Sequence, residues 1–111
     1  MTVTALLLIA GGVLLAWAGW LGMTDRLALN SWAGIRTETT MRSQETWEAA
    51  HHAGSPWIIA GGIVLVITGG AMIVVGDETT AAYVSLIGAI VLAALVIAGG
   101  WIGQQAARRT Q

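Results

Sequence analysis

Three long stretches of the chain consist of apolar residues without a charged side chain. They cover residues 3–23, 57–75 and 81–103. A helix of about 20 residues spans the ~30 Å hydrocarbon core of a bilayer. None of the three has the polar face that a helix on a soluble protein needs. The pattern predicts three transmembrane helices. No basic segment precedes the first one, so we expect it to be retained rather than cleaved as a signal peptide.

A polar segment, residues 24–56, separates the first two apolar runs. Ser43 is a typical N-cap residue, and the pattern after it predicts a short amphipathic helix over residues 44–53. Gly54 and Pro56 then read as a helix stop. We expect this short helix to lie on the membrane surface or against the ends of the apolar helices, with Trp47 facing down.

Composition narrows the class of protein further. Hydrophobic residues make up 56% of the chain and charged residues 10%, with a formal net charge of −1. This composition excludes a soluble domain and gives no indication of nucleic-acid binding. The absence of Cys excludes a disulfide framework and a thiol nucleophile.

The basic residues indicate an orientation. With three spans, all of them fall on one side of the membrane: Arg26, Arg36, Arg42, Arg108 and Arg109. The positive-inside rule places that side in the cytoplasm. The fold class is thus all-α: one integral membrane domain with three transmembrane helices, a structured cytoplasmic loop, an outer N-terminus and a cytoplasmic C-terminus.

Glycine recurs in doublets inside the apolar runs. Small residues let helix backbones approach closely in lipid. One interpretation is tight packing of the three helices on each other, and another is a face for self-association or for a partner. The glycines concerned are Gly11, Gly12, Gly61, Gly62, Gly69, Gly70, Gly99, Gly100 and Gly103.

The apolar runs contain no Asp, Glu, Lys, Arg or His. Pumps and proton-coupled transporters place ionisable groups at membrane depth. An autonomous transporter is therefore disfavoured.

Candidate chemistry in the polar segment is incomplete. Glu48 and His51 have the Glu-x-x-His spacing of di-iron sites, but those sites need a second such motif and further carboxylates. Ser43 and the neighbouring threonines lack the motifs that accompany hydrolase nucleophiles. We expect no catalytic residue, no metal and no cofactor.

The remaining role for the polar segment is the recognition of a partner or of lipid. We expect Arg36, Thr37, Arg42, Trp47 and His51 to contact a partner or lipid, since arginine suits bidentate contacts with phosphates and carboxylates. The alternative for Arg36 is that it ties the loop to the chain's own helix ends. Trp47 and His51, four residues apart, can touch on one helix face.

The polar segment also resembles the SdpI/YfhL-type family of small bacterial membrane proteins. The resemblance covers roughly residues 27–75, and the third apolar run completes the three-span unit. Its matching positions are Asn30, Gly34, Ile35, Arg36, Thr37, Thr40, Ser43, Glu45, Trp47, His51 and Gly54. Glu38 stands where many relatives have Pro, and His52 where many have a basic residue. The founding member has extra N-terminal spans.

The resemblance implies the architecture, the importance of Arg36, Thr37, Trp47 and His51, and neither an enzyme activity nor a cofactor. It suggests a bacterial plasma-membrane protein that gives immunity or stress protection against a membrane-active peptide. A small accessory subunit of a larger respiratory or transport complex is the alternative, and a small transporter ranks last. The expected partners are the lipid bilayer and another membrane protein or a second copy, not nucleic acid.

Overall fold

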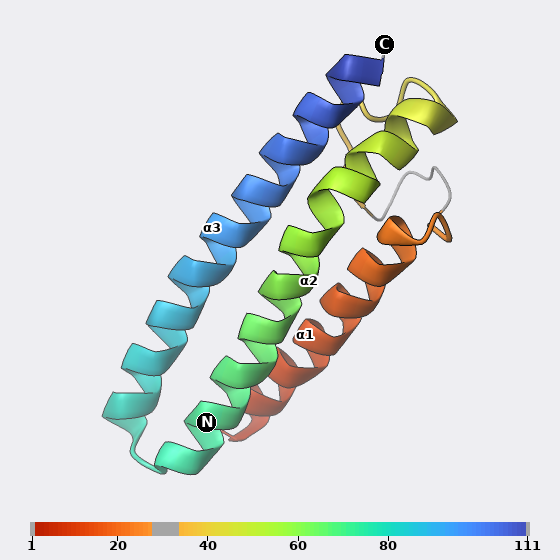
Figure 1. Cartoon of the computed structure of the whole chain (residues 1–111). Coiled ribbons are helices and arrows are strands. Elements are labelled where there is room, and N and C mark those ends of the chain that lie inside the picture. The colour runs from red at the N-terminus through yellow and green to blue at the C-terminus, as the bar shows by residue number, and fades with distance from the viewer. Residues whose placement is uncertain (1, 28–33, 111) are drawn as a thin grey trace.

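The fold consists of three long helices in a computed structural model that describes residues 2–27 and 34–110. They are α1 (Thr2–Met23), α2 (Gln44–Val75) and α3 (Glu78–Thr110), shown in Figure 1. No strand occurs among the described residues. All three helices are long and apolar enough to cross a membrane. Asn30, one of the positions that match the SdpI/YfhL-type family, lies outside the described residues.

The helix α2 is the central element, with α1 on one side and α3 on the other (Figure 1). Both outer helices pack along α2, whereas no described Cα atom of α1 lies within 8 Å of one in α3. The N-terminus and the turn between α2 and α3 lie at one end of the molecule, and the C-terminus and the long loop lie at the other (Figure 1).

Large apolar side chains cover the outside of the helices. Val3 and Ile97 are each 70% exposed, and Trp101 is 64% exposed. An apolar surface of this extent belongs in contact with lipid rather than water. The chain is therefore a multi-pass membrane protein.

Backbone contacts at glycine hold α1 and α2 together. A Cβ atom built on Gly12 would lie 2.5 Å from the Gly62 carbonyl oxygen, and one on Gly62 would lie 2.5 Å from the Gly12 carbonyl oxygen. Nearer the N-terminus, a Cβ on Gly69 would lie 2.6 Å from the Ala5 carbonyl oxygen. Only glycine permits such approach, so these positions fix where the two helices meet.

The α2–α3 interface is also formed by close backbone contacts at glycine, on another face of α2. A Cβ on Gly54 would lie 2.5 Å from the Gly99 carbonyl oxygen, and one on Gly103 would lie 2.8 Å from that of Ala50. Gly61 faces α3 more loosely, with its Cβ position 3.0 Å from Leu92.

Each of three glycine doublets contributes only one member to these interfaces. Positions 12, 69 and 99 are packed, whereas nothing lies within 4 Å of a Cβ built on Gly11, Gly70 or Gly100. The packing expected of these last three is thus not found within the described part of the chain. One of two adjacent helical residues faces away because they point about 100° apart.

The break expected at Gly54 is absent, so the prediction of a short helix over 44–53 followed by a separate span over 57–75 is wrong. The helix α2 runs unbroken from Gln44 to Val75 through Pro56. Gly54 serves the close contact with Gly99 instead of ending a helix. The third helix is also longer than the apolar run 81–103, because α3 continues to Thr110.

Short turns complete the fold. Asp25, with φ +61°, ends α1 in the left-handed conformation, which Asp tolerates better than most residues. At the other end, Gly76 (φ +68°) ends α2. The Asp77 carboxylate then accepts hydrogen bonds from the side chain and backbone of Thr80, and these lower its pKa.

Candidate functional site

The long loop between α1 and α2 is described over residues 24–27 and 34–43. Its second part, residues 34–43, folds back onto the ends of α2 and α3, and we call it the docked loop. Two threonines shape its turn. The Thr37 backbone N–H donates to Thr40 Oγ1 (2.8 Å), and the Thr40 N–H donates to Thr37 Oγ1 (3.1 Å). Thr40 Oγ1 donates in turn to the Ile35 carbonyl (2.8 Å). Thr40 is fully buried, so its hydroxyl anchors the turn inside the structure, while Glu38 in the same turn is exposed.

A capping box joins the docked loop to α2. The Thr46 N–H donates to Ser43 Oγ, and the Ser43 N–H donates to Thr46 Oγ1, both at 3.1 Å. Thr46 Oγ1 also donates to the Thr40 carbonyl (3.0 Å). The cap therefore stabilises the helix start and fixes the end of the docked loop at once.

Trp47 and His51 form the centre of the site. Their ring centroids lie 4.3 Å apart, and the two residues are 1% and 3% exposed. Trp47 Nε1 donates to the Leu27 carbonyl (2.7 Å), which ties the end of α1 to α2. Gly34, with φ +107°, lies against both rings. A Cβ at Gly34 would be 2.6 Å from His51 Nε2, so no larger residue fits there without movement.

The hydrogen bonds of His51 define its protonation state. Its Nδ1 lies 2.7 Å from the Trp47 carbonyl, which can only accept, and its Nε2 lies 3.0 Å from the Ile35 N–H, which can only donate. The imidazole is therefore neutral, with its proton on Nδ1. His51 precedes the charge-free part of α2 that crosses the membrane. Burial, opposed by the bond to the Trp47 carbonyl and assisted by the charge of His52, lowers its pKa below 6.5.

Contacts with α3 complete the docking. The Ile35 side chain enters a notch between α2 and α3: its Cδ1 would be 2.7 Å from a Cβ on Gly54 and 2.9 Å from one on Gly103. Gln104 Nε2 donates to Thr39 Oγ1 (3.0 Å), and its Oε1 accepts from the Thr37 hydroxyl. The docked loop is thus held to α2 and α3 by both apolar and polar contacts.

The predicted contact residues divide into two groups. Trp47 and His51 are buried, so direct contact with a partner or with lipid, as the sequence predicts, does not fit this structure. They hold the docked loop in place, as Thr37 does. Arg36 and Arg42 are exposed. Arg42 lies 3.8 Å from Glu38, whereas Arg36 forms no hydrogen bond or ion pair with a described residue and so does not tie the loop to the helix ends.

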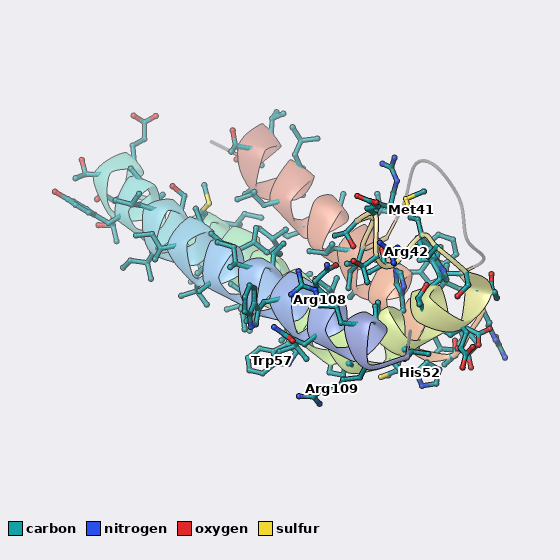
Figure 2. All side chains as sticks on the ribbon, turned by 90° about the horizontal axis from the view of Figure 1, so that it is seen from above. Met41, Arg42, His52, Trp57, Arg108 and Arg109 are labelled. Atoms are coloured by element: carbon teal, nitrogen blue, oxygen red, sulfur yellow. The ribbon has the colours of Figure 1, made fainter. Side chains whose placement is uncertain are left out.

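A second link joins α1 to α2 outside this buried centre. His52 Nε2 lies 2.5 Å from Asp25 Oδ1, with both side chains about half exposed. Arg26 stacks over the Trp20 ring at 4.8 Å. Looking down on this end, Figure 2 shows Arg42 on the loop and Arg108 and Arg109 at the end of α3.

Sequence reasoning missed several residues that the site uses. Gln104, Thr46 and Leu27 carry hydrogen bonds of the docked loop, and Ile35 carries its apolar anchor. Gln104 could be found as the first polar residue after the third apolar run. Leu27 contributes only a carbonyl, for which the sequence holds no signal.

The chemistry open to the site is limited. Both nitrogens of His51 are engaged by backbone groups, so the ring is not available as a base or a ligand. No group of three His, Asp or Glu side chains that could hold a metal ion occurs within the described ranges.

Fold and site together define a small multi-pass helical membrane protein whose extramembrane loop is anchored in its own helix ends. Residues 26–102 match the SdpI/YfhL protein family, and the chain belongs to that family. The match includes the docked loop, α2 and most of α3. The family is not known as enzymatic. No curated protein and no solved structure matches the chain.

Proposed function

We propose that the chain is a non-enzymatic protein of the bacterial plasma membrane that protects its cell against a membrane-active peptide. The observation that carries the proposal is the docked loop. In the family pattern, the buried rings of Trp47 and His51, with Gly34 against them, hold the loop in a fixed position. A rigid surface suits binding, because little conformational freedom is lost when a partner arrives.

Arg36 is the part of this surface most suited to a partner. Its guanidinium is exposed and has no described partner, while its neighbours Ile35 and Thr37 are fixed by α2 and α3. A guanidinium on a fixed backbone can form a bidentate pair with a carboxylate of an inserted peptide. Arg42 adds a second cation on the same loop.

The distribution of arginine supports a cytoplasmic position for the docked loop. All five basic residues lie in the loop or the C-terminal end, and the turn at the opposite end carries Asp77 and Glu78. The positive-inside rule then places the N-terminus outside.

A protection assay tests the proposal. The chain is expressed in a sensitive bacterial host that lacks such a protein, and the minimal inhibitory concentration of membrane-active peptides is measured. We expect protection by the wild type, loss of protection by Arg36→Ala, and full protection by Arg109→Ala at equal membrane abundance. An unchanged inhibitory concentration for every peptide tested, or full protection by Arg36→Ala, would contradict the proposal.

A small accessory subunit of a larger membrane complex is the second candidate function. Gly11 on α1 and Gly70 on α2 favour this candidate. Nothing lies within 4 Å of a Cβ built on either, so another helix could approach both closely. Purification in mild detergent tests this candidate by mass spectrometry of the bound proteins. A stoichiometric partner lost on Gly70→Leu would support it, and a chain that purifies alone would reject it.

A further inference from the structure

A cavity of about 300 Å³ lies between α1 and α3, beneath the docked loop. Its walls are mostly apolar, with Leu15 and Ala18 from α1, Ile58 from α2, and Val96 and Gly100 from α3, while His51 and Ser55 of α2 add polar groups. Leu27, Gly34 and Ile35 close it at the loop end. Because α1 and α3 do not meet over α2 in the described part of the chain, the cavity faces the membrane between them.

Two polar side chains line the cavity in the described part of the chain, and His51 is engaged by backbone groups. Ser55 of α2 lines it and is 1% exposed, yet its hydroxyl makes no hydrogen bond with any described residue. A Cβ on Gly22 would lie 2.8 Å from this oxygen, so the hydroxyl points across the cavity end towards α1. Serine in a helix commonly bonds to the carbonyl four residues earlier, and no such bond holds the Ser55 hydroxyl, which is thus available as a donor at the edge of the cavity.

The depth of the cavity in the membrane and its volume distinguish a helix from an acyl chain as its occupant. The cavity lies at the last turns of α1 and of the apolar part of α3, where hydrocarbon gives way to head groups. A helix is about 10–12 Å wide, so one turn needs roughly 500 Å³ and does not fit. A single acyl chain is narrow enough to enter, and the volume lies at the small end of the ligand-pocket range of about 300–1,000 Å³.

We propose that this cavity binds one acyl chain of a membrane phospholipid, with the chain's ester carbonyl accepting a hydrogen bond from Ser55. The apolar walls take the first part of the chain, and the remainder passes out between α1 and α3 into the bilayer. The glycerol and phosphate lie towards Leu27, at the level of Arg26, whose guanidinium is exposed beside Trp20. The site is separate from the proposed contact at Arg36.

The test uses the full chain in phospholipid vesicles that contain a phospholipid with a photoreactive diazirine near its ester group. After irradiation, the labelled residues are mapped by mass spectrometry. The wild type should carry label on the segments around Ser55 and Gly100 above the level of the outer helix faces. Ser55→Ala removes one neutral hydrogen bond and should lower this labelling about two- to tenfold.

Two leucine substitutions separate the cavity from general lipid contact. Gly100→Leu fills the cavity without a clash, since nothing lies within 4 Å of its Cβ position, and should reduce the cavity label to the level of the outer faces. Gly70→Leu also enters open space, but away from the cavity, and should leave the label unchanged. Circular dichroism of each variant confirms that it is folded.

Several outcomes would overturn the proposal. These are equal cavity label in wild type and Gly100→Leu, wild-type label confined to the outer faces, and no effect of Ser55→Ala. Label from a diazirine-bearing membrane-active peptide in the same segments, with none from the phospholipid, would assign the cavity to the peptide instead.

Discussion

At the scale of single residues, the site depends on a histidine that functions as a neutral hydrogen-bonding group. His51 links the Trp47 carbonyl in α2 to the Ile35 N–H in the docked loop. A protonated ring would turn Nε2 into a donor facing another donor. Docking of the loop is therefore fully favoured above pH 6.5. It weakens as the pH falls from 6.5 towards the lowered pKa, because the undocked imidazole takes up its proton first.

This state of His51 predicts a definite NMR titration. In detergent micelles at pH 7.5, the ring nitrogens should show the tautomer with the proton on Nδ1, and the midpoint of titration should lie below 6.5. A proton on Nε2 at pH 7.5, or a midpoint at or above 6.5, would contradict the assignment.

Gly34 predicts a second effect at this scale. Its φ of +107° and its contact with His51 exclude a side chain. Gly34→Ala should weaken docking by about 1–3 kcal/mol, typical of a strained backbone position. Hydrogen exchange of the Ile35 amide measures the effect, which should be a clear loss of protection. Gly70→Ala, in open space, should retain it; equal protection in both variants would show that Gly34 is not required.

At the scale of elements, α2 organises the molecule because both other helices pack on it. Its glycines face in two directions: Gly62 and Gly69 towards α1, and Gly54 and Gly61 towards α3. The bundle is thus held by two separate interfaces.

Because the two interfaces are separate, a substitution at one of them should destabilise only that helix pair. Gly62→Leu forces its side chain into the Gly12 backbone and should destabilise the α1–α2 pair by about 1–3 kcal/mol. Thermal unfolding in detergent, followed by circular dichroism, should show a lower midpoint. Gly70→Leu adds the same side chain in open space and should match the wild type. A lowered midpoint for both variants would indicate a general effect of bulk rather than a contact.

The sequence predicts the spans well and their junctions poorly. Charge-free runs are set by the bilayer, so the three helices, the Ser43 cap and the Trp47–His51 contact follow from local pattern. The expected stop at Gly54 and Pro56 is wrong because helix-end signals are local, whereas the contact with Gly99 is made by a distant part of the chain. The same limit applies to Gly11, Gly70 and Gly100, since helix rotation is set by neighbours.

At the scale of the whole molecule, the two ends differ. One end carries the polar docked loop, and the other carries only the short turn between α2 and α3. The docked loop and the C-terminus share the first end, and the N-terminus shares the second with the turn between α2 and α3 (Figure 1). This arrangement and the arginines together support the proposed cytoplasmic position of the docked loop.

Accessibility of single cysteines tests that orientation, and the absence of native Cys makes the background clean. Arg109→Cys should react with a membrane-impermeant maleimide only in opened cells, and Thr79→Cys should react in intact cells. The reverse pattern would place the docked loop outside.

The central claim is that the loop is docked in its own helix ends, and one contact tests it most directly. Ile35 Cδ1 lies in the notch between Gly54 and Gly103. With isotope-labelled isoleucine methyl groups in micelles, the Ile35 δ1 methyl should show nuclear Overhauser effects to the α protons of both glycines. A methyl group with neither effect, beside intact contacts within α2, would contradict the docked loop.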